Sequence, residues 1–443
     1  MILRHRAWIA IFFAKMAHKL IRLFKLGSGT TLPGRVALTL SPDLMKTLRK
    51  TIPETVIAVT GTNGKTTTAG LLTKLLEADG HRVIHNHLGA NMLSGIATAL
   101  VCQSNKKGRL EDADVAVLEV DEASLRRVAA HVPITHVVVT NLFRDQLDRY
   151  GELDTTAQFI REGIEKTRLN DPEKPEGTLF LNADDQAVMA LADSASQVVT
   201  FGVDRSALTD HPLDNDLLSL VPCQFEQNKA IESQPDKQFI LTEETPSGLT
   251  GRFKNNSTDV QEEINVSVPI PGRFNAYNAL AAMAVASQLN MSLDGFTNAF
   301  SSHENVFGRA ETSVVNDRTV RTFLIKNPAG ATEVLRWVMQ DPKARVLLAL
   351  NDMDADGRDV SWIWDAAFEM LAPLAFPDKP LYCTGVRRGD MATRLYYGGV
   401  PKNSVTVLDE LLTSVDLATQ ELAPDETLYV LPTYTALLKL TSA

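Results

Sequence analysis

The chain has 443 residues, which at roughly 150 residues per domain predicts two or three domains. Hydrophobic residues make up 44% and charged residues 22% of the chain, as in folded globular proteins, which excludes a disordered or low-complexity chain. The net charge of -10 is unevenly distributed, because residues 1–50 hold ten Lys and Arg and a single acid, Asp43. These residues therefore carry +9 and the remainder -19. An acidic bulk of this kind argues against nucleic acid as a partner.

The cysteines indicate the redox environment. Cys102, Cys223 and Cys383 lie 121 and 160 residues apart, so no CxxC pair occurs. A zinc ribbon or a dithiol redox site needs cysteines at short spacing. The sequence therefore predicts no zinc and a reducing, cytoplasmic location.

The first 34 residues predict an amphipathic helix and a Gly/Pro linker. The longest apolar run, residues 8–14, is shorter than the ~20 residues that span a bilayer, and basic residues follow it where a signal peptide has small ones. Basic residues recur at spacings of three and four, opposite an apolar set. The basic set is Lys15, His18, Lys19, Arg22 and Lys25, and the apolar set is Trp8, Ile9, Phe12, Phe13, Met16, Leu20 and Phe24. We expect the apolar set to dock on the protein itself, with peripheral contact to the inner membrane face as the alternative.

Beyond residue 34, apolar runs alternate with helix-length segments, which predicts an α/β fold with a parallel sheet covered by helices. The strands expected in a central domain, residues 35–303, are 56–60, 82–85, 115–120, 136–140 and 178–181. Within it, residues 204–263 are polar and acidic with four prolines, which predicts an insertion or an irregular β excursion. Strands expected at 322–325, 346–350, 380–384, 404–408 and 428–431 predict a smaller α/β domain over residues 304–443.

A phosphate-binding loop is the first motif that carries chemistry. The run 56–60 leads into a loop, and a helical pattern follows at once. The loop residues are Gly61, Thr62, Asn63, Gly64, Lys65, Thr66 and Thr67. Glycines let backbone N–H groups face phosphate oxygens, Lys65 supplies a cation, and Thr66 offers a hydroxyl to Mg²⁺. Val59 stands where the common GxxxxGK[ST] pattern has its first glycine.

The loop, TGTNGKTT, resembles that of Mur ligases and folylpolyglutamate synthetases. Further segments extend the resemblance: VLEVDEASL at 117–125, TNLFRDQLDRYGELD at 140–154, LNADD at 181–185, GRFNAYNALAA at 272–282 and FGRAE at 307–311. The resemblance implies that the central domain is a Mur ligase-like phosphate-loop domain that binds ATP and Mg²⁺. It implies Thr66 and Glu119 as Mg²⁺ ligands, and Asn275, Asn278 and Arg309 as nucleotide-site residues.

Two segments narrow the resemblance to the MurT family of ligase subunits. Residues 324–330 read LIKNPAG, where ordinary Mur ligases have an acid and a histidine. Residues 348–369 read LALNDMDADGRDVSWIWDAAFE, which is similar to the MurT signature, as are HNHLGANM at 85–92 and LPTYTAL at 431–437. Many MurT proteins carry a four-cysteine zinc ribbon in the middle domain. The segment 204–263 holds only Cys223, so we again expect no zinc.

Three aspartates, Asp354, Asp356 and Asp359, follow an expected strand. They could bind a divalent cation or cap a helix over residues 362–371, and their spacing alone favours capping. The MurT resemblance instead implies that Asp359 reaches a GatD-like glutaminase partner. There it would complete a Cys-His-Asp triad whose other members belong to that partner.

The resemblance implies an ATP-dependent carbon–nitrogen ligase with glutamine as the nitrogen donor. ATP would phosphorylate the α-carboxyl of D-isoglutamate in the lipid II stem peptide, and ammonia from the partner would displace phosphate. Lys65, Glu119 and Asp359 are the expected catalytic residues. Arg309 and Lys326 are expected on phosphates or substrate carboxylates, with surface ion pairs as the alternative. Addition of an amino acid to a carboxylate, or a non-catalytic ATP-binding scaffold, are the competing functions.

Overall fold

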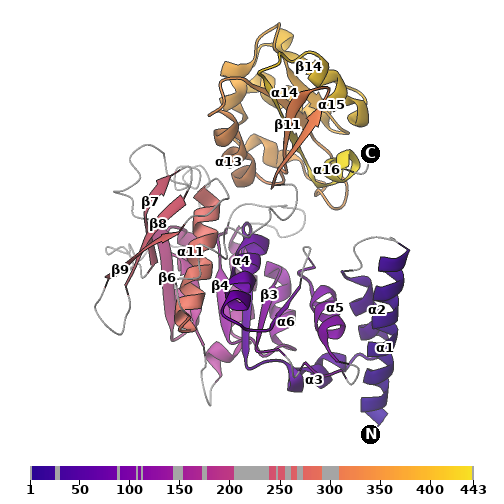
Figure 1. Ribbon diagram of the computed structural model, residues 1–443, viewed down its shortest axis with the longest axis vertical. Coiled ribbons are helices and arrows are strands. Elements are labelled where there is room, and N and C mark those ends of the chain that lie inside the picture. The colour runs from indigo at the N-terminus through magenta and orange to yellow at the C-terminus, as the bar shows by residue number, and fades with distance from the viewer. Residues whose placement is uncertain are drawn as a thin grey trace. The chain divides into compact units, whose positions relative to one another are not determined.

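The structure is a computed structural model. It describes residues 2–24, 30–86, 90–105, 108–110, 113–142, 153–171, 177–203, 239–245, 248–254, 261–266, 273–291 and 309–441. The described residues divide into two compact α/β units, one formed by residues before 292 and one by residues from 309 onward (Figure 1). The predicted α/β class is confirmed for both units. The domain boundaries after residues 34 and 303 stay predictions.

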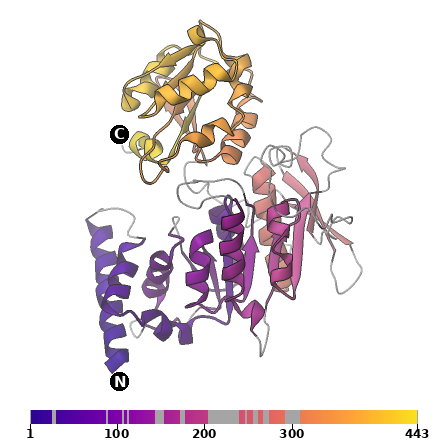
Figure 2. The same ribbon diagram turned by 180° about the vertical axis from the view of Figure 1, so that it is seen from behind.

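The first unit is built on a nine-stranded sheet with helices on both faces (Figures 1 and 2). The strand order is β2-β3-β1-β4-β5-β6-β7-β8-β9, and neighbours are parallel as far as β7. The parallel strands that precede the insertion are β1 (Thr55–Thr60), β2 (Val83–His85), β3 (Val115–Glu119), β4 (His136–Val139), β5 (Leu179–Asn182) and β6 (Val198–Val203). The five predicted strands are confirmed, and β6 is an additional one.

Two hydrophobic cores cover the faces of this sheet. Val56 and Ala58 of β1 belong to one core, whereas Ile57 and Val59 belong to the other. Burial on both faces explains why β1 reads as a continuous apolar run. The main helices are α1 (Ile2–Leu23), α2 (Leu32–Leu40), α3 (Leu44–Leu48), α4 (Lys65–Ala78), α5 (Leu93–Gln103), α6 (Leu125–Ala129), α8 (Leu153–Ile164), α9 (Gln186–Met189) and α11 (Arg273–Gln288).

The predicted insertion extends the sheet. Strands β7 (Phe239–Thr245), β8 (Gly248–Lys254) and β9 (Gln261–Val266) continue it beyond β6, with antiparallel pairing of β7 with β8 and of β8 with β9. The expected β excursion is therefore present, and it is irregular at one place, because the pairing of β7 with β8 shifts register between Leu241 and Glu243. Residues 204–238, with Cys223, lie outside the described residues, so the absence of zinc stays a prediction.

Helix α1 corrects one expectation. It packs on α2 and α5 through small side chains, because Ala7, Ala10 and Ala14 are buried and allow close approach. The apolar set expected to dock is exposed instead, namely Trp8, Ile9, Phe12, Phe13, Met16, Leu20 and Phe24. Lys15, expected on the solvent side, points inward, since its Nζ donates to Ser104 O and to Asn105 O. The prediction that the apolar set docks on the protein itself is wrong.

The second unit is built on a six-stranded sheet in the order β10-β11-β15-β12-β13-β14. All neighbours are parallel except the edge pair of β10 and β11. The strands are β10 (Arg309–Val315), β11 (Arg318–Phe323), β12 (Ala344–Ala349), β13 (Leu381–Thr384), β14 (Val405–Val407) and β15 (Thr427–Pro432). The helices are α13 (Pro328–Val338), α14 (Arg388–Tyr397), α15 (Leu411–Gln420) and α16 (Tyr434–Thr441).

The helix expected over residues 362–371 is replaced by two short 3₁₀ helices. They are η6 (Ser361–Trp364) and η7 (Phe368–Leu374). Ala367 has a ψ angle of 52°, outside the helical range, and Pro373 lacks an N–H donor within η7. A continuous α-helix is therefore broken there, and the expectation is wrong.

Candidate functional site

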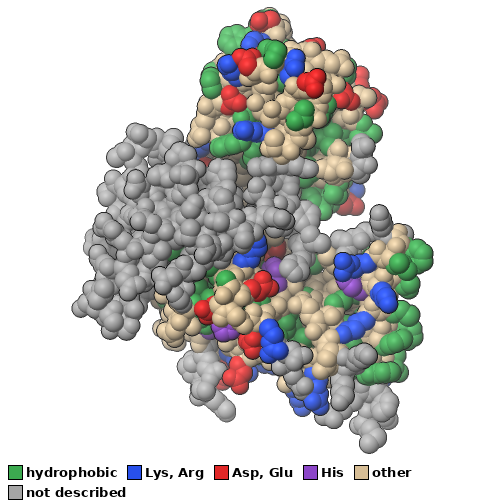
Figure 3. Space-filling view, in the orientation of Figure 1, with side chains coloured by type: hydrophobic (Ala, Val, Ile, Leu, Met, Phe, Trp, Pro, Cys, Tyr) green, Lys and Arg blue, Asp and Glu red, His purple; other side chains and the backbone are tan. Residues whose placement is uncertain are grey.

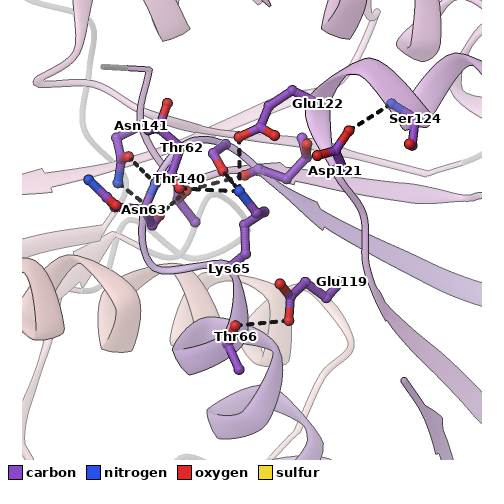
Figure 4. A network of polar contacts seen from close by, with 12 residues as sticks. Thr62, Asn63, Lys65, Thr66, Glu119, Asp121, Glu122, Ser124, Thr140 and Asn141 are labelled. Atoms are coloured by element: carbon purple, nitrogen blue, oxygen red, sulfur yellow. Dashed lines mark hydrogen bonds and ion pairs between the residues drawn. The ribbon is translucent and has the colours of Figure 1, made fainter. Parts of the chain in front are cut away.

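The candidate site lies at the carboxyl ends of the central parallel strands of the first unit, the edge at which α/β sheets bind ligands. Strand β1 lies between β3 and β4, and Glu119 pairs with Val59 in the parallel register of β1 and β3. The loop after β1 is therefore flanked by the last residue of β3 and by the turn after β4 (Figure 4). Three of the motifs identified in the sequence meet at this place.

Two glycines shape the loop. Gly61 and Gly64 have φ angles of 118° and 83°, which residues with a Cβ atom rarely adopt. A Cβ on Gly61 would lie 2.4 Å from Thr140 Oγ1, and one on Gly64 would lie 2.0 Å from Asn278 Oδ1. Helix α4 begins directly after Gly64, at Lys65, so the last residues of the motif form its first turn. The predicted junction of strand, glycine loop and helix is therefore present.

Hydrogen bonds anchor the loop to the turn after β4 (Figure 4). The Thr62 N–H donates to Asn141 O, and the Asn63 N–H donates to Asn141 Oδ1, both at 2.8 Å. The Thr140 hydroxyl and the Asn141 amide donate to Asn63 O at 2.7 and 3.1 Å. Two residues of the turn after β4, Thr140 and Asn141, thus fix the backbone of the loop.

Lys65 lies buried among carboxylates. Its Nζ donates to Glu122 Oε1 at 2.9 Å, to Thr62 O at 3.2 Å and to Gly61 O, and 11% of its side chain is exposed. Burial acts to lower the pKa of Lys65, but the charges of Glu122 and Glu119 outweigh it and raise that pKa. Burial also raises the pKa of Glu122, against the opposing attraction of Lys65. The loop therefore holds a fixed cation at neutral pH.

Thr66 and Glu119 form the part of the site that suits a divalent cation. The Thr66 hydroxyl donates to Glu119 Oε2 at 2.9 Å, and Glu119 is buried. Asn86 fixes the backbone of Glu119, because its Nδ2 donates to Glu119 O and its Oδ1 accepts the Glu119 N–H, both at 2.8 Å. A hydroxyl and a carboxylate oxygen side by side are ligands that Mg²⁺ accepts, so these residues fit the predicted ion. No group of three or more His, Cys, Asp or Glu placed to hold a metal occurs among the described residues.

Asn275 and Asn278, predicted at the nucleotide site, both lie on α11. Asn278 is buried and its Oδ1 accepts the Thr68 hydroxyl at 3.2 Å, on the first turn of α4. Asn278 Nδ2 donates to Asn275 Oδ1 at 3.4 Å. The structure therefore places Asn278 against the loop and Asn275 beside it. Contact of either residue with a nucleotide stays a prediction.

Four polar residues of the site were given no role from the sequence. They are Asn86, Glu122, Thr140 and Asn182. Each lies at, or within three residues beyond, the carboxyl end of a parallel strand, and this position is the signal that identifies them. Asn182 Nδ2 donates to Thr140 O at 3.0 Å, and Asp185 Oδ2 accepts the Leu142 N–H at 2.7 Å. The LNADD segment therefore supports the turn that anchors the loop.

The three aspartates of the second unit have separate partners. Asp354 forms an ion pair with Arg358 at 2.6 Å, on the exposed side of the turn. Asp359 is half-buried, and its Oδ1 accepts the Ser361 N–H at 2.8 Å where η6 begins. Asp356 points into the unit and is buried. These contacts do not gather the three carboxylates around one point, and the contact of Asp359 with Ser361 is of the capping kind.

Two segments that resemble MurT contact each other behind this turn. Asp356 Oδ1 accepts the Thr435 N–H at 2.7 Å. The Asn351 N–H donates to Thr433 Oγ1, and Asn351 Nδ2 donates to Thr435 Oγ1, both at 3.0 Å. The segment 431–437 therefore fixes the backbone that carries the aspartates.

Family models and individual proteins match the chain over most of its length. The Mur ligase middle domain matches residues 59–286, and the MurT ligase C-terminal domain matches residues 324–437. Subunit MurT of the glutamine-hydrolyzing lipid II isoglutaminyl synthase of Streptococcus pneumoniae is 35% identical, over 94% of this chain and 92% of that protein. The chain belongs to the MurT family. The Staphylococcus aureus MurT subunit is 33% identical, over 88% of this chain and 87% of that protein.

Solved structures share the MurT chain's fold. A pseudomurein peptide ligase type C from Methanothermus fervidus has a TM-score of 0.65 at 20% identity, covering 90% of this chain and 80% of that one. MurF from Thermotoga maritima in complex with ADP has a TM-score of 0.62 at 14% identity, covering 92% and 83%. The predicted Mur ligase-like fold is confirmed.

Membership of the MurT family confirms the predicted ligase class, so the chain is an ATP-dependent ligase. Two weaker assignments stay predictions. Arg309 opens β10, and its side chain lies outside what the structure describes. Lys326 lies between β11 and α13, next to Asn327, whose Oδ1 accepts the Gly330 N–H at 2.9 Å and caps α13.

Proposed function

We propose that this MurT-family ligase amidates the α-carboxyl of D-isoglutamate in the stem peptide of lipid II, during peptidoglycan biosynthesis. The observation that carries the proposal is the loop site in a chain of this family. There, a buried cation at Lys65 lies beside the Thr66 and Glu119 oxygens. The names of the S. pneumoniae and S. aureus relatives supply the substrate and the product class.

The proposed reaction has two steps. In the first, a carboxylate oxygen of the substrate attacks the γ-phosphorus of ATP, the bond to the bridging oxygen breaks, and ADP leaves with that electron pair. In the second, ammonia attacks the carbonyl carbon of the acyl phosphate, loses a proton, and inorganic phosphate leaves. Activation is needed because the carboxylate oxygen is otherwise a poor leaving group.

The chain's own residues account for the first step. The Lys65 ammonium lies at the loop, where it would neutralise negative charge on the phosphate oxygens as it moves during transfer. The backbone of the loop and the N-terminus of α4 add further positive partial charge. Thr66 and Glu119 would hold Mg²⁺, which would add positive charge beside the phosphates.

A glutaminase partner would supply the ammonia. The relatives are named as subunits of glutamine-hydrolyzing enzymes, which supports a GatD-like partner for this chain. Asp359 is half-buried on a turn fixed by the 431–437 segment, so its carboxylate is held and still accessible. In the proposal this carboxylate orients a histidine of the partner, which in turn activates a cysteine.

One assay tests the proposal and separates it from its competitors. Purified chain is incubated with ATP, Mg²⁺, lipid II, ammonium and a mixture of amino acids, and the product is weighed. We expect ADP, phosphate and a product whose mass reflects replacement of a hydroxyl by an amino group. A product enlarged by an amino acid would identify an amino-acid-adding ligase, and ATP binding without turnover would identify a scaffold.

A further inference from the structure

Helix α1 presents a long apolar surface to solvent. The apolar face of α1 is defined by Trp8, Phe12, Phe13, Leu20, Leu23 and Phe24, which are 43% to 70% exposed. It runs along a helix of 22 residues, about 33 Å at 1.5 Å per residue. Figure 3 shows these hydrophobic side chains gathered along the outer edge of α1, with Lys and Arg side chains beside them. Contiguous exposed apolar surface of this kind marks an interaction site.

The helix is held in place by its opposite face. The opposite face buries Ala7, Ala10, Ala14 and Ile21 against the rest of the first unit. The helix is therefore held by this buried face, and the exposed apolar face is not needed to keep it in place. The orientation of that face is therefore fixed before anything binds to it. Binding would cost little ordering entropy, because the helix is already formed.

Basic residues border the apolar face of α1. With 100° between successive residues, Lys19 and Arg22 fall along one edge of the face and Arg6 falls along the other. All three are exposed. Long basic side chains can bury their stems and extend their charges to a neighbouring anionic layer. An apolar face rich in Trp and Phe with basic edges is typical of helices that lie in a membrane interface.

We propose that the apolar face of α1 docks on the anionic surface of a phospholipid bilayer. Its aromatic and aliphatic side chains enter the headgroup boundary, while Arg6, Lys19 and Arg22 contact lipid phosphates. The charge distribution favours this orientation, since residues 1–50 carry +9 and the rest of the chain carries -19. An anionic surface attracts the first part and repels the remainder.

A second copy of the chain is a poorer occupant of this face. A symmetric pair would bring the basic edges of two α1 helices together, and like charges repel. The bilayer instead supplies opposite charge to the same edges. Among the described residues, no helix is both long and apolar enough to span a membrane, so the contact is peripheral. The inference depends on α1 alone and is independent of the proposed substrate.

Sedimentation of the full-length chain with vesicles tests the inference. We expect binding to vesicles of phosphatidylcholine and phosphatidylglycerol, weaker binding to phosphatidylcholine alone, and release at high salt. The triple variant Phe12→Ser/Leu20→Ser/Leu23→Ser should bind at least ~10-fold more weakly, because it removes three inserted side chains. Its control, Val407→Ser/Leu412→Ser/Leu417→Ser, alters side chains that are 45% to 55% exposed in the second unit and should bind as wild type.

A charge-matched pair tests the basic edges. Lys19→Gln/Arg22→Gln should weaken binding by roughly 10-fold, whereas Arg49→Gln/Lys50→Gln removes the same charge elsewhere and should weaken it less. Trp8 emission, read against a Trp8→Phe variant, should shift to shorter wavelength with vesicles. Three outcomes would overturn the inference: no binding by the wild type, equal binding by the apolar variant, or a solution dimer or glutaminase complex that this variant disrupts without any vesicle effect.

Discussion

Two groups of three acidic residues lie at or just beyond the carboxyl ends of parallel strands in this chain, and they differ in whether they share one counter-charge. Glu119, Asp121 and Glu122 at the end of β3 are all buried, and their negative charge acts together on Lys65. In the second unit, Asp354, Asp356 and Asp359 follow β12, and each binds a partner of its own. Three neighbouring carboxylates thus surround one buried cation in the first unit, whereas in the second unit they stabilise the conformation of a turn.

The comparison shows that burial with a shared counter-charge distinguishes the two groups. Glu122 and Lys65 are 6% and 11% exposed at their side chains, so water screens their attraction little. Asp354 and Arg358 are 86% and 69% exposed, and such a pair contributes little to stability. We therefore expect substitutions in the group at the end of β3 to change the rate of ligation. Substitutions in the group after β12 should instead change the contact of Asp359 with the glutaminase partner, or the stability of the second unit.

The largest effect is expected at Lys65. Lys65→Ala should abolish ligation even with ammonium supplied directly, because the transferred phosphoryl group loses its main protein cation. Product formation from lipid II is the measurement, with ATP affinity and the melting temperature as controls for binding and folding. Near-normal turnover of a folded variant would show that the buried group at β3 is not the chemical site.

Asp359→Asn should separate the two half-reactions. Ammonium-driven ligation should stay near the wild-type rate, while glutamine-driven ligation by the reconstituted complex should fall by up to about 10⁴-fold, the loss known for the triad acid of a serine protease. The ratio of the two rates is measured alongside melting temperature. If Asp359 only caps η6, the variant should lose stability by ~1 kcal/mol and leave that ratio unchanged.

Asp356 and Asp354 provide a matched pair within one turn. Asp356→Ala should lower the free energy of unfolding by about 3 kcal/mol, because it removes a buried carboxylate and leaves the half-buried Thr435 N–H without its acceptor. Asp354→Ala should leave unfolding essentially unchanged, since its ion pair with Arg358 is exposed. Urea denaturation of both variants is the measurement. Equal losses would contradict the contrast between the inner and outer sides of the turn.

His136 on β4 shows what burial does without a carboxylate partner of the kind Lys65 has. Burial lowers the pKa of His136 to about 4 from 6.5. Between these two pH values His136 is therefore mostly neutral in the folded chain and mostly protonated in the unfolded chain. The free energy of unfolding is therefore expected to decrease by about 1.5 kcal/mol as the pH is lowered from 6.5 to 5. His136→Gln should remove this part of the pH dependence of urea unfolding. An unchanged slope would show that other groups cause it.

Most of the strands that are buried on both faces were predicted from the sequence, although the buried strand β6 was missed. Strands β1 and β12 read as continuous apolar runs because both faces are covered. Edge strand β10 was missed, since Thr312, Ser313 and Val314 are exposed and leave no such run. For α1, the periodicity showed an amphipathic helix but did not show which face docks. Alanine carries little hydrophobic signal yet allows the closest helix packing.

For the candidate site, the sequence predicted the residues of the phosphate loop but not the residues that the fold brings into contact with it. Gly61, Lys65 and Thr66 follow from the order of strand, loop and helix, which the structure confirms. Glu122 lies three residues beyond Glu119 on a different turn of the chain, and only the fold brings its carboxylate to Lys65. Spacing in sequence cannot supply such a contact, because it depends on the register of β1 against β3.

The contact of Asn278 with the loop bears on the order in which the protein is made and folds. Thr68 and Asn278 are 210 residues apart, and Asn278 lies against Gly64. A nascent chain that has emerged only as far as β9 contains the phosphate loop and α4. It still lacks α11, the helix whose Asn278 packs against them. Contacts between such distant positions form late, because the intervening chain must first be organised. We therefore expect nucleotide-binding competence only after α11 has left the ribosome, so a polypeptide truncated before residue 273 should bind ATP weakly even if its first six strands assemble.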